Sequence, residues 1–164
     1  MNNLFENRRR DEPAVPPEGR ENREKVSMNI LLAEDNDALS GFFIRVLTGM
    51  GCIVTLVKDG EALLNELADK AKNYDLLITD NTMPKVKGIE ALKRIREDAL
   101  FEHTKSIKVI LNSSDVDGTL EPGVLSLDGV FLPKPVSLAT LSEAVKEISR
   151  ELKKPPEPIQ ERPA

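Results

Sequence analysis

The stretch ILLAED, residues 30–35, joins a short apolar run directly to two carboxylates. The pattern recurs along the chain, because Asp80 follows the run LLIT (76–79) and Lys134 follows the run VFLP (130–133). Short apolar runs of this kind are typical of buried strands in a parallel sheet. In an open parallel α/β sheet, ligands bind beyond the carboxyl ends of the strands, so we expect these charged residues to gather at one edge.

Amphipathic helical patterns lie between the apolar runs. Apolar residues at three- and four-residue spacing predict helical faces, and shorter runs predict strands. The expected strands are 29–33, 53–57, 75–79, 107–111 and 129–132, and the expected helical faces span 39–50, 63–71, 89–95 and 138–152. Strict alternation of strand and helix indicates an α/β fold, with a parallel sheet covered by helices on both faces.

The helix due at 115–128 is the weak element of this pattern. Gly118, Pro122 and Gly123 fall inside it, and each of them opposes a regular helix interior. We therefore expect a short, irregular or mobile helix in this segment.

The length of 164 residues fits one domain with a tail at each end. Residues 1–27 are rich in Glu, Arg, Asn and Pro without hydrophobic periodicity, and residues 153–164 are rich in Pro. Neither segment has enough apolar surface to offset the entropy lost on ordering, so we expect both to be disordered. The folded domain is expected to span 28–152.

The composition indicates which partners and which cellular compartment to expect. A net charge of −5 gives no reason to expect direct binding to nucleic acid. The single cysteine, Cys52, excludes an internal disulfide and suits a reducing compartment. No apolar run approaches the roughly 20 residues that span a bilayer, and the N-terminus lacks the apolar segment of a secretory signal. We expect a cytoplasmic protein that does not contact a membrane.

Glu34, Asp35 and Asp80 bring costly negative charge together unless a cation lies among them. With Lys134 opposite, the set predicts a divalent-metal site with a reactive aspartate, which is a site for phosphoryl transfer. Taken alone, the acidic pair and the polar residues after it favour a helix N-cap with an acidic first turn. Asp80 and Lys134 together favour the metal site instead.

Residues 28–152 resemble the receiver domain of two-component response regulators, in the single-domain form found in the bacterial chemotaxis regulator. The resemblance rests on the acidic pair after the first strand, the motif Asp-x-x-Met-Pro at 80–84, a hydroxyl residue after the fourth strand and Lys-Pro after the fifth. It implies a flavodoxin-like, doubly wound, five-stranded parallel sheet in the order 2-1-3-4-5, with helices on both faces.

The resemblance also implies roles for the acidic residues. Asp80 matches the phosphoacceptor, whose carboxylate attacks a phosphoryl group in line and becomes an aspartyl phosphate. Asp35 would bind Mg²⁺ directly, and Glu34 would bind it directly or through a metal-bound water. The backbone carbonyl of Thr82 is the further protein ligand that the resemblance implies.

Three more residues match positions that respond to the phosphoryl group. Lys134 would place a fixed positive charge on a phosphoryl oxygen, and the Lys134-Pro135 bond is expected to be cis. The hydroxyl of Ser113, which the strand register favours over Ser114, would donate a hydrogen bond to the phosphoryl group. Phe131 matches an aromatic switch that turns inward, with the output read on the face formed by the fourth helix, fifth strand and fifth helix.

The function that the resemblance implies is that of a signalling receiver. It would take a phosphoryl group from a histidine kinase or a histidine phosphotransfer protein, catalyse only its own phosphorylation and dephosphorylation, and act as a monomer or a weak phosphorylation-dependent dimer. No DNA-binding motif follows residue 152, so we expect output through a downstream protein or a phosphorelay. Thr82 and Asp115 match positions that tune the phosphoryl lifetime.

Two other functions are weighed against this one. A receiver-like module that binds partners without phosphorylation is left open by the irregular segment at 115–128 and by the serine pair, although all the site residues are present. A phosphohydrolase with an aspartyl intermediate, as in haloacid-dehalogenase-like enzymes, needs a second aspartate two residues after the nucleophile. That residue is Thr82, which argues against a hydrolase.

Overall fold

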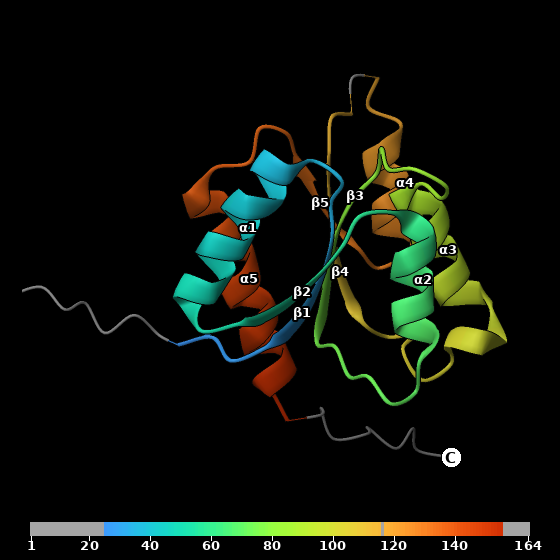
Figure 1. Ribbon diagram of the computed structural model, residues 1–164, viewed down its shortest axis with the longest axis horizontal. Coiled ribbons are helices and arrows are strands. Elements are labelled where there is room, and N and C mark those ends of the chain that lie inside the picture. The colour runs from blue at the N-terminus through green and yellow to red at the C-terminus, as the bar shows by residue number, and fades with distance from the viewer. Residues whose placement is uncertain (1–24, 116, 156–164) are drawn as a thin grey trace, which may run out of the picture.

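Five parallel strands form one sheet in the order β2-β1-β3-β4-β5 (Figure 1). The structure is a computed structural model that describes residues 25–115 and 117–155. The strands are β1 (Asn29–Ala33), β2 (Ile53–Val57), β3 (Leu76–Asp80), β4 (Lys108–Ser113) and β5 (Val130–Pro133). The predicted strand order and the doubly wound, flavodoxin-like arrangement are confirmed.

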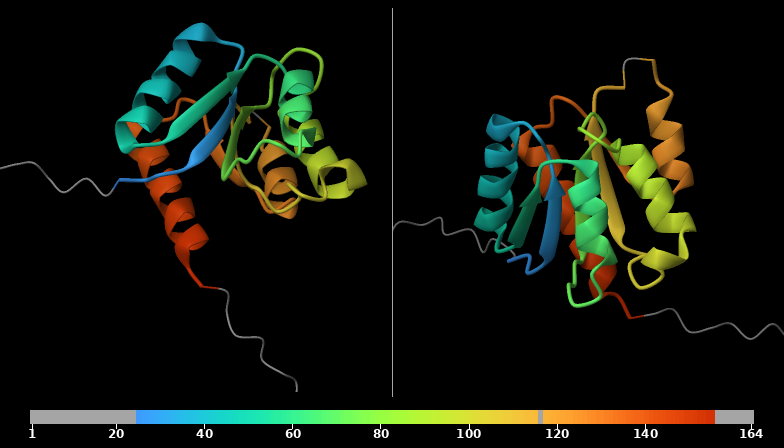
Figure 2. Two further views of the ribbon diagram at one scale, coloured as in Figure 1. Left: turned by 60° about the horizontal axis from the view of Figure 1, so that its bottom comes forward. Right: turned by 45° about the vertical axis from the view of Figure 1, so that its right-hand side comes forward.

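Helices cover both faces of the sheet, as Figures 1 and 2 show. They are α1 (Asp37–Met50), α2 (Gly60–Ala68), α3 (Gly88–Glu97), α4 (Leu120–Ser126) and α5 (Leu138–Lys153), with a 3₁₀ turn at Ala99–Phe101. The helices α1 and α5 lie on one face, and α2, α3 and α4 lie on the other (Figure 1). Each crossover therefore returns the chain to the same end of the sheet, which collects the carboxyl ends of all the strands.

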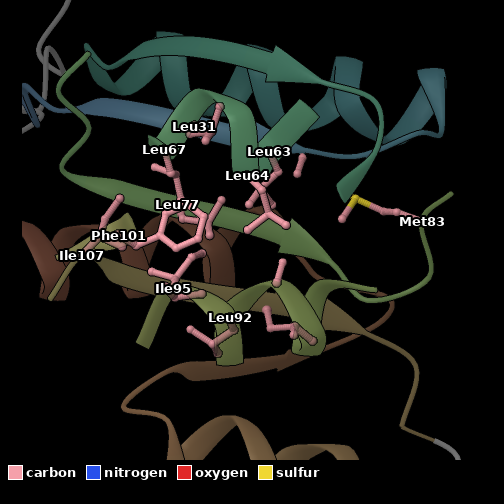
Figure 3. Packing of buried hydrophobic residues seen from close by; sticks show 14 of the residues in the cluster. Leu31, Leu63, Leu64, Leu67, Leu77, Met83, Leu92, Ile95, Phe101 and Ile107 are labelled. Carbon is pink, nitrogen blue, oxygen red and sulfur yellow. The ribbon is translucent and has the colours of Figure 1, made fainter. Parts of the chain in front are cut away.

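The core consists of two apolar clusters, because successive residues of a strand point to opposite faces of the sheet. Leu31 and Leu77 pack on the side of α2 and α3, where Figure 3 shows them among leucine and isoleucine side chains of those helices. Ile30 and Ile78 pack on the opposite side, together with residues of α1 and α5. The central strands are thus buried on both faces, which explains their continuous apolar runs.

The packed part of the chain begins earlier than the sequence predicts. Val26 lies in the segment predicted as a tail, yet it is only 2% exposed and packs in the cluster under α1 and α5. Its N–H donates to the carbonyl of Met50 over 2.9 Å. A single apolar residue between Lys25 and Ser27 creates no periodicity, so the pattern could not reveal this contact. At the other end, α5 extends to Lys153, the first residue of the predicted C-terminal tail. Residues 1–24 and 156–164 of the predicted tails lie outside the described residues.

The fourth helix is short, as predicted. α4 has 7 residues, against 14 in α1 and 16 in α5, and it contains both Pro122 and Gly123. Pro122 occupies the first turn of this helix, where a missing N–H costs no intrahelical hydrogen bond. The helix therefore forms despite its sequence, and it stops within two turns.

Candidate functional site

Three carboxylates meet at the carboxyl edge of the sheet. Glu34 and Asp35 follow β1, Asp80 ends β3, and one carboxylate oxygen from each lies within 4.8 Å of the others. The pairing of β1 with β3 explains this meeting, because Ala33 is the register partner of Thr79 and the acidic residues come next on each strand. The structure thus brings together the acidic residues that the sequence singled out.

Lys134 lies against two of these carboxylates. Its Nζ is 3.1 Å from Asp80 Oδ2 and 3.7 Å from Glu34 Oε2. Its backbone N–H donates to the carbonyl of Ser113 over 3.0 Å, so the end of β5 is tied to the end of β4. The Lys134-Pro135 peptide bond is cis, as the resemblance predicted.

The N-cap of α1 is the residue after the acidic pair, not a residue of the pair itself. Asn36 caps α1, with its side-chain oxygen accepting the N–H of Leu39 over 2.9 Å. The backbone N–H of Asn36 donates to Glu34 Oε1 over 3.0 Å. Glu34 therefore accepts a hydrogen bond from the capping residue but does not itself cap the helix. Asp35 is exposed beside it.

Two of the three carboxylates at this edge are buried. Glu34 is 2% exposed and Asp80 is 6% exposed. Desolvation by burial raises the pKa of Glu34 above its ordinary value, although the Asn36 N–H and the Lys134 ammonium act in the opposite direction. The carboxylates of Asp80 and Asp35 raise this pKa further, through charge repulsion. Additional positive charge at this edge would relieve the repulsion.

The residues fit a small, hard divalent cation. Asp80 Oδ1 is buried without a hydrogen-bond partner among the described residues, so it is an acceptor that a cation can satisfy. Carboxylate oxygens from Glu34, Asp35 and Asp80 are the ligands that Mg²⁺ prefers, and Mg²⁺ usually keeps several waters beside a few protein ligands. Thr82, whose carbonyl the resemblance adds to this set, lies exposed in the loop after β3.

The hydroxyl and the aromatic residue lie on the same face of the sheet. Ser113 is 3% exposed at the end of β4, whereas Ser114 is exposed, so burial agrees with the preference for Ser113. Leu111 packs in the cluster under α2, α3 and α4, and strand alternation turns Ser113 toward the same side. Phe131, the register partner of Leu111, is partly buried against that cluster.

Asp115 has a structural role that the sequence pattern did not reveal. Its carboxylate accepts the backbone N–H groups of Thr119, Leu120 and Glu121 over 3.1, 3.0 and 2.9 Å. These are donors that the start of α4 leaves without intrahelical partners. The hydrogen bond from Glu121, followed by those from Leu120 and Thr119, lowers the pKa of Asp115 below its ordinary value. Asp115 therefore joins the loop after Ser113 to α4.

This cap predicts a pH dependence confined to the start of α4. Because the folded pKa of Asp115 is depressed, its stabilisation is present above the ordinary carboxyl pKa of about 3.9 and is lost as the pH falls through the folded value. We expect the amide chemical shifts of Thr119, Leu120 and Glu121 to titrate with a midpoint below that ordinary pKa, as measured by NMR. In Asp115→Asn, which keeps a capping oxygen without a titrating group, this titration should disappear from the Thr119 and Leu120 shifts. A midpoint at or above the ordinary value would contradict the cap.

The fold and this acidic edge agree with the sequence comparison. Residues 30–146 match the family model of the response regulator receiver domain, and the chain belongs to that family. The two-component response regulator ARR3 of Arabidopsis thaliana is 34% identical over 138 residues, which cover 75% of this chain and 57% of that protein. The 3′,5′-cyclic-nucleotide phosphodiesterase regA of Dictyostelium discoideum is 27% identical over 122 residues, covering 74% of this chain and 15% of that protein. The chain thus spans at most 57% of the length of either relative.

Solved structures share the fold. The receiver domain of the Francisella response regulator 1452 matches with a TM-score of 0.67 at 24% identity, over 77% of this chain and 99% of that chain. The co-crystal structure of the Saccharomyces cerevisiae phosphotransfer protein Ypd1 with the receiver domain of Ssk1 gives a TM-score of 0.67 at 23% identity, over 77% and 91% of the two chains. Within residues 25–115 and 117–155, no helix has the length and apolar character needed to cross a membrane.

Proposed function

We propose that this chain is a phosphoacceptor response regulator of a two-component or phosphorelay pathway, in which Asp80 takes a phosphoryl group from a phosphohistidine donor. The observation that supports this most directly is the environment of Asp80. Its carboxylate is 6% exposed, with Oδ2 held 3.1 Å from the Lys134 ammonium and Oδ1 without a hydrogen-bond partner among the described residues. A buried carboxylate at the carboxyl edge of a parallel sheet, with the lysine ammonium beside it, is suited to attack phosphorus.

The transfer step is a displacement at phosphorus. A carboxylate oxygen of Asp80 forms a bond to phosphorus while the bond from phosphorus to the donor imidazole nitrogen breaks. The electron pair of the broken bond stays on the imidazole, which then takes up a proton. Lys134 stabilises the negative charge on the phosphoryl oxygens, because its ammonium already lies at hydrogen-bonding distance from the attacking carboxylate.

Glu34, Asp35 and Asp80 would hold Mg²⁺ beside the reacting group, with the carbonyl of Thr82 as a further ligand. When bound, Mg²⁺ supplies positive charge that offsets the charge developing on the phosphoryl oxygens. The chain itself supplies the fixed geometry, since the backbone N–H of Asn36 orients Glu34 over 3.0 Å. The only chemistry proposed for the chain is its own phosphorylation and dephosphorylation, without an independent substrate.

The proposed output begins with Ser113 and Phe131, which share a face of the sheet. The hydroxyl of Ser113 would donate to a phosphoryl oxygen, and Phe131 would turn inward beside it. Such a local event biases a two-state element whose output surface is formed by α4, β5 and α5. Asp115 supports this route, because it connects the loop after Ser113 to the backbone of α4.

The proposed phosphodonor is a histidine kinase or a histidine phosphotransfer protein, and the proposed output is a downstream protein in the cytoplasm. Relatives that support this choice include the osmosensing histidine protein kinase SLN1 of Saccharomyces cerevisiae, which is 28% identical over 138 residues. The Ypd1 complex supports it as well, because a phosphotransfer protein there binds a domain of the same fold. We propose a monomer, or a weak dimer that forms on phosphorylation.

The test is incubation of the full chain with acetyl phosphate and Mg²⁺, followed by intact mass spectrometry. We expect one phosphoryl adduct, and none when EDTA removes the cation. A chain that forms no adduct but binds beryllofluoride with Mg²⁺ would be a receiver that needs its protein donor. A chain that responds to neither reagent would contradict the proposal and favour the phosphorylation-independent binding module.

A further inference from the structure

Asn112 is a buried polar residue on a strand whose preceding residues are apolar. It is 1% exposed in β4, and its register partners are Asp80 on β3 and Leu132 on β5. Ile110, two residues earlier on the same face, is fully buried in the apolar cluster under α1 and α5. Because burying a carboxamide is costly unless it is hydrogen-bonded, packing alone does not explain an asparagine here.

Only the amide nitrogen of Asn112 has a hydrogen-bond partner among the described residues, and the amide oxygen has none. Its Nδ2–H donates to the carbonyl of Leu132 over 2.9 Å, two residues before Lys134. Its Oδ1 is buried without a hydrogen-bond partner among the described residues, as is Oδ1 of the neighbouring Asp80. The strand that precedes the lysine is therefore held by the amide nitrogen of this side chain, and the amide oxygen can accept a hydrogen bond.

Asn112 and Lys134 line the same cavity. This cavity of about 430 Å³ lies between α1 and the loop after β5, and Phe42 and Pro135 form part of its wall. An ammonium group has three N–H donors, and the described contacts of Lys134 Nζ are with two carboxylates, Asp80 and Glu34. The carboxamide oxygen of Asn112 is neutral, so it can accept a further hydrogen bond from the lysine without competing for its charge.

We propose that Asn112 is a positioning residue for Lys134. Its Nδ2–H holds the end of β5, and its Oδ1 accepts a hydrogen bond from the Lys134 ammonium when phosphoryl oxygens replace the Asp80 carboxylate as the anionic partner. This role rests on the proposed function, since it concerns the phosphoryl-bound state of the site. It directs the lysine toward the phosphoryl group and away from the carboxylates around it.

The test compares Asn112→Leu with Ile110→Leu in the full chain. Leucine has the same branched arrangement of heavy atoms as asparagine but lacks both polar groups, and Ile110→Leu is a volume-conserving control on the same strand face. Isothermal titration calorimetry would measure the affinity for Mg²⁺ alone and for beryllofluoride at saturating Mg²⁺. We expect Asn112→Leu to weaken beryllofluoride binding about tenfold, the loss of one hydrogen bond to a charged group. Mg²⁺ affinity should match that of the control, whereas the urea midpoint should fall, because the buried hydrogen bond to the Leu132 carbonyl is lost.

A second variant separates positioning from packing. Asn112→Thr keeps a hydroxyl that both donates and accepts, so it should recover part of the beryllofluoride affinity. Unchanged beryllofluoride affinity in Asn112→Leu would overturn the inference, as would an equal fall in the affinities for Mg²⁺ and for beryllofluoride. A wild-type chain that binds Mg²⁺ but not beryllofluoride would overturn the proposed function, and this inference with it.

Discussion

In Asp80→Asn we expect no phosphoryl adduct at all after incubation with acetyl phosphate and Mg²⁺. The amide nitrogen and oxygen of asparagine are poor nucleophiles, so the variant removes the attacking group while keeping the shape of the buried side chain. It also removes one of the carboxylate oxygens that gather within 4.8 Å at this edge, which should weaken Mg²⁺ binding. Intact mass spectrometry measures the adduct directly.

A matched control lies at the other end of the same strand. Asp75 immediately precedes β3, and its Oδ2 accepts the N–H of Asn29 over 2.7 Å, remote from the acidic edge. Asp75→Asn makes the same chemical change and keeps an oxygen that can accept this bond. We expect the control to form as much adduct as the wild type, with a stability loss of no more than about 1 kcal/mol. An adduct that persists in Asp80→Asn would place the acceptor on another residue.

Most of the fold follows from the spacing of apolar residues, and the site follows from where the strands end. The runs at 30–33 and 76–79 became β1 and β3 because both faces of the sheet are covered, so no alternation interrupts them. Once the strands are parallel and adjacent, the residues that follow each run must meet at one edge. This is why the sequence alone predicts that Glu34, Asp80 and Lys134 lie together.

The remaining features depend on contacts that hydropathy does not encode. β3 includes Asp80 and β4 includes Ser113, because backbone pairing continues past the apolar runs into polar residues. Val26 packs through a partner distant in sequence, at Met50. Asp115 became the cap of α4 only because the loop after β4 turns its carboxylate toward three backbone N–H groups. Tertiary geometry decides each of these cases.

Gly88→Ala should lower the free energy of unfolding by about 3 kcal/mol, at the upper end of the range for overpacking. A Cβ at Gly88 would lie 2.2 Å from the carbonyl oxygen of Asp80 and 3.0 Å from its carbonyl carbon. The obstructing atoms are backbone, so no side-chain rotation relieves the clash. The start of α3 or the end of β3 must shift, and a shift of β3 would displace the Asp80 carboxylate.

Gly41→Ala is the matched control for this change, because a Cβ at Gly41 meets nothing within 4 Å. Gly41 lies inside α1, where alanine is favoured over glycine by about 1 kcal/mol, so the control should be stabilised. Urea unfolding followed by circular dichroism measures both variants. A urea midpoint of Gly88→Ala equal to that of the wild type would contradict the close contact between Gly88 and the backbone of Asp80. A Gly88→Ala chain that is still folded should form its phosphoryl adduct more slowly, since the helix start and the acceptor share this contact.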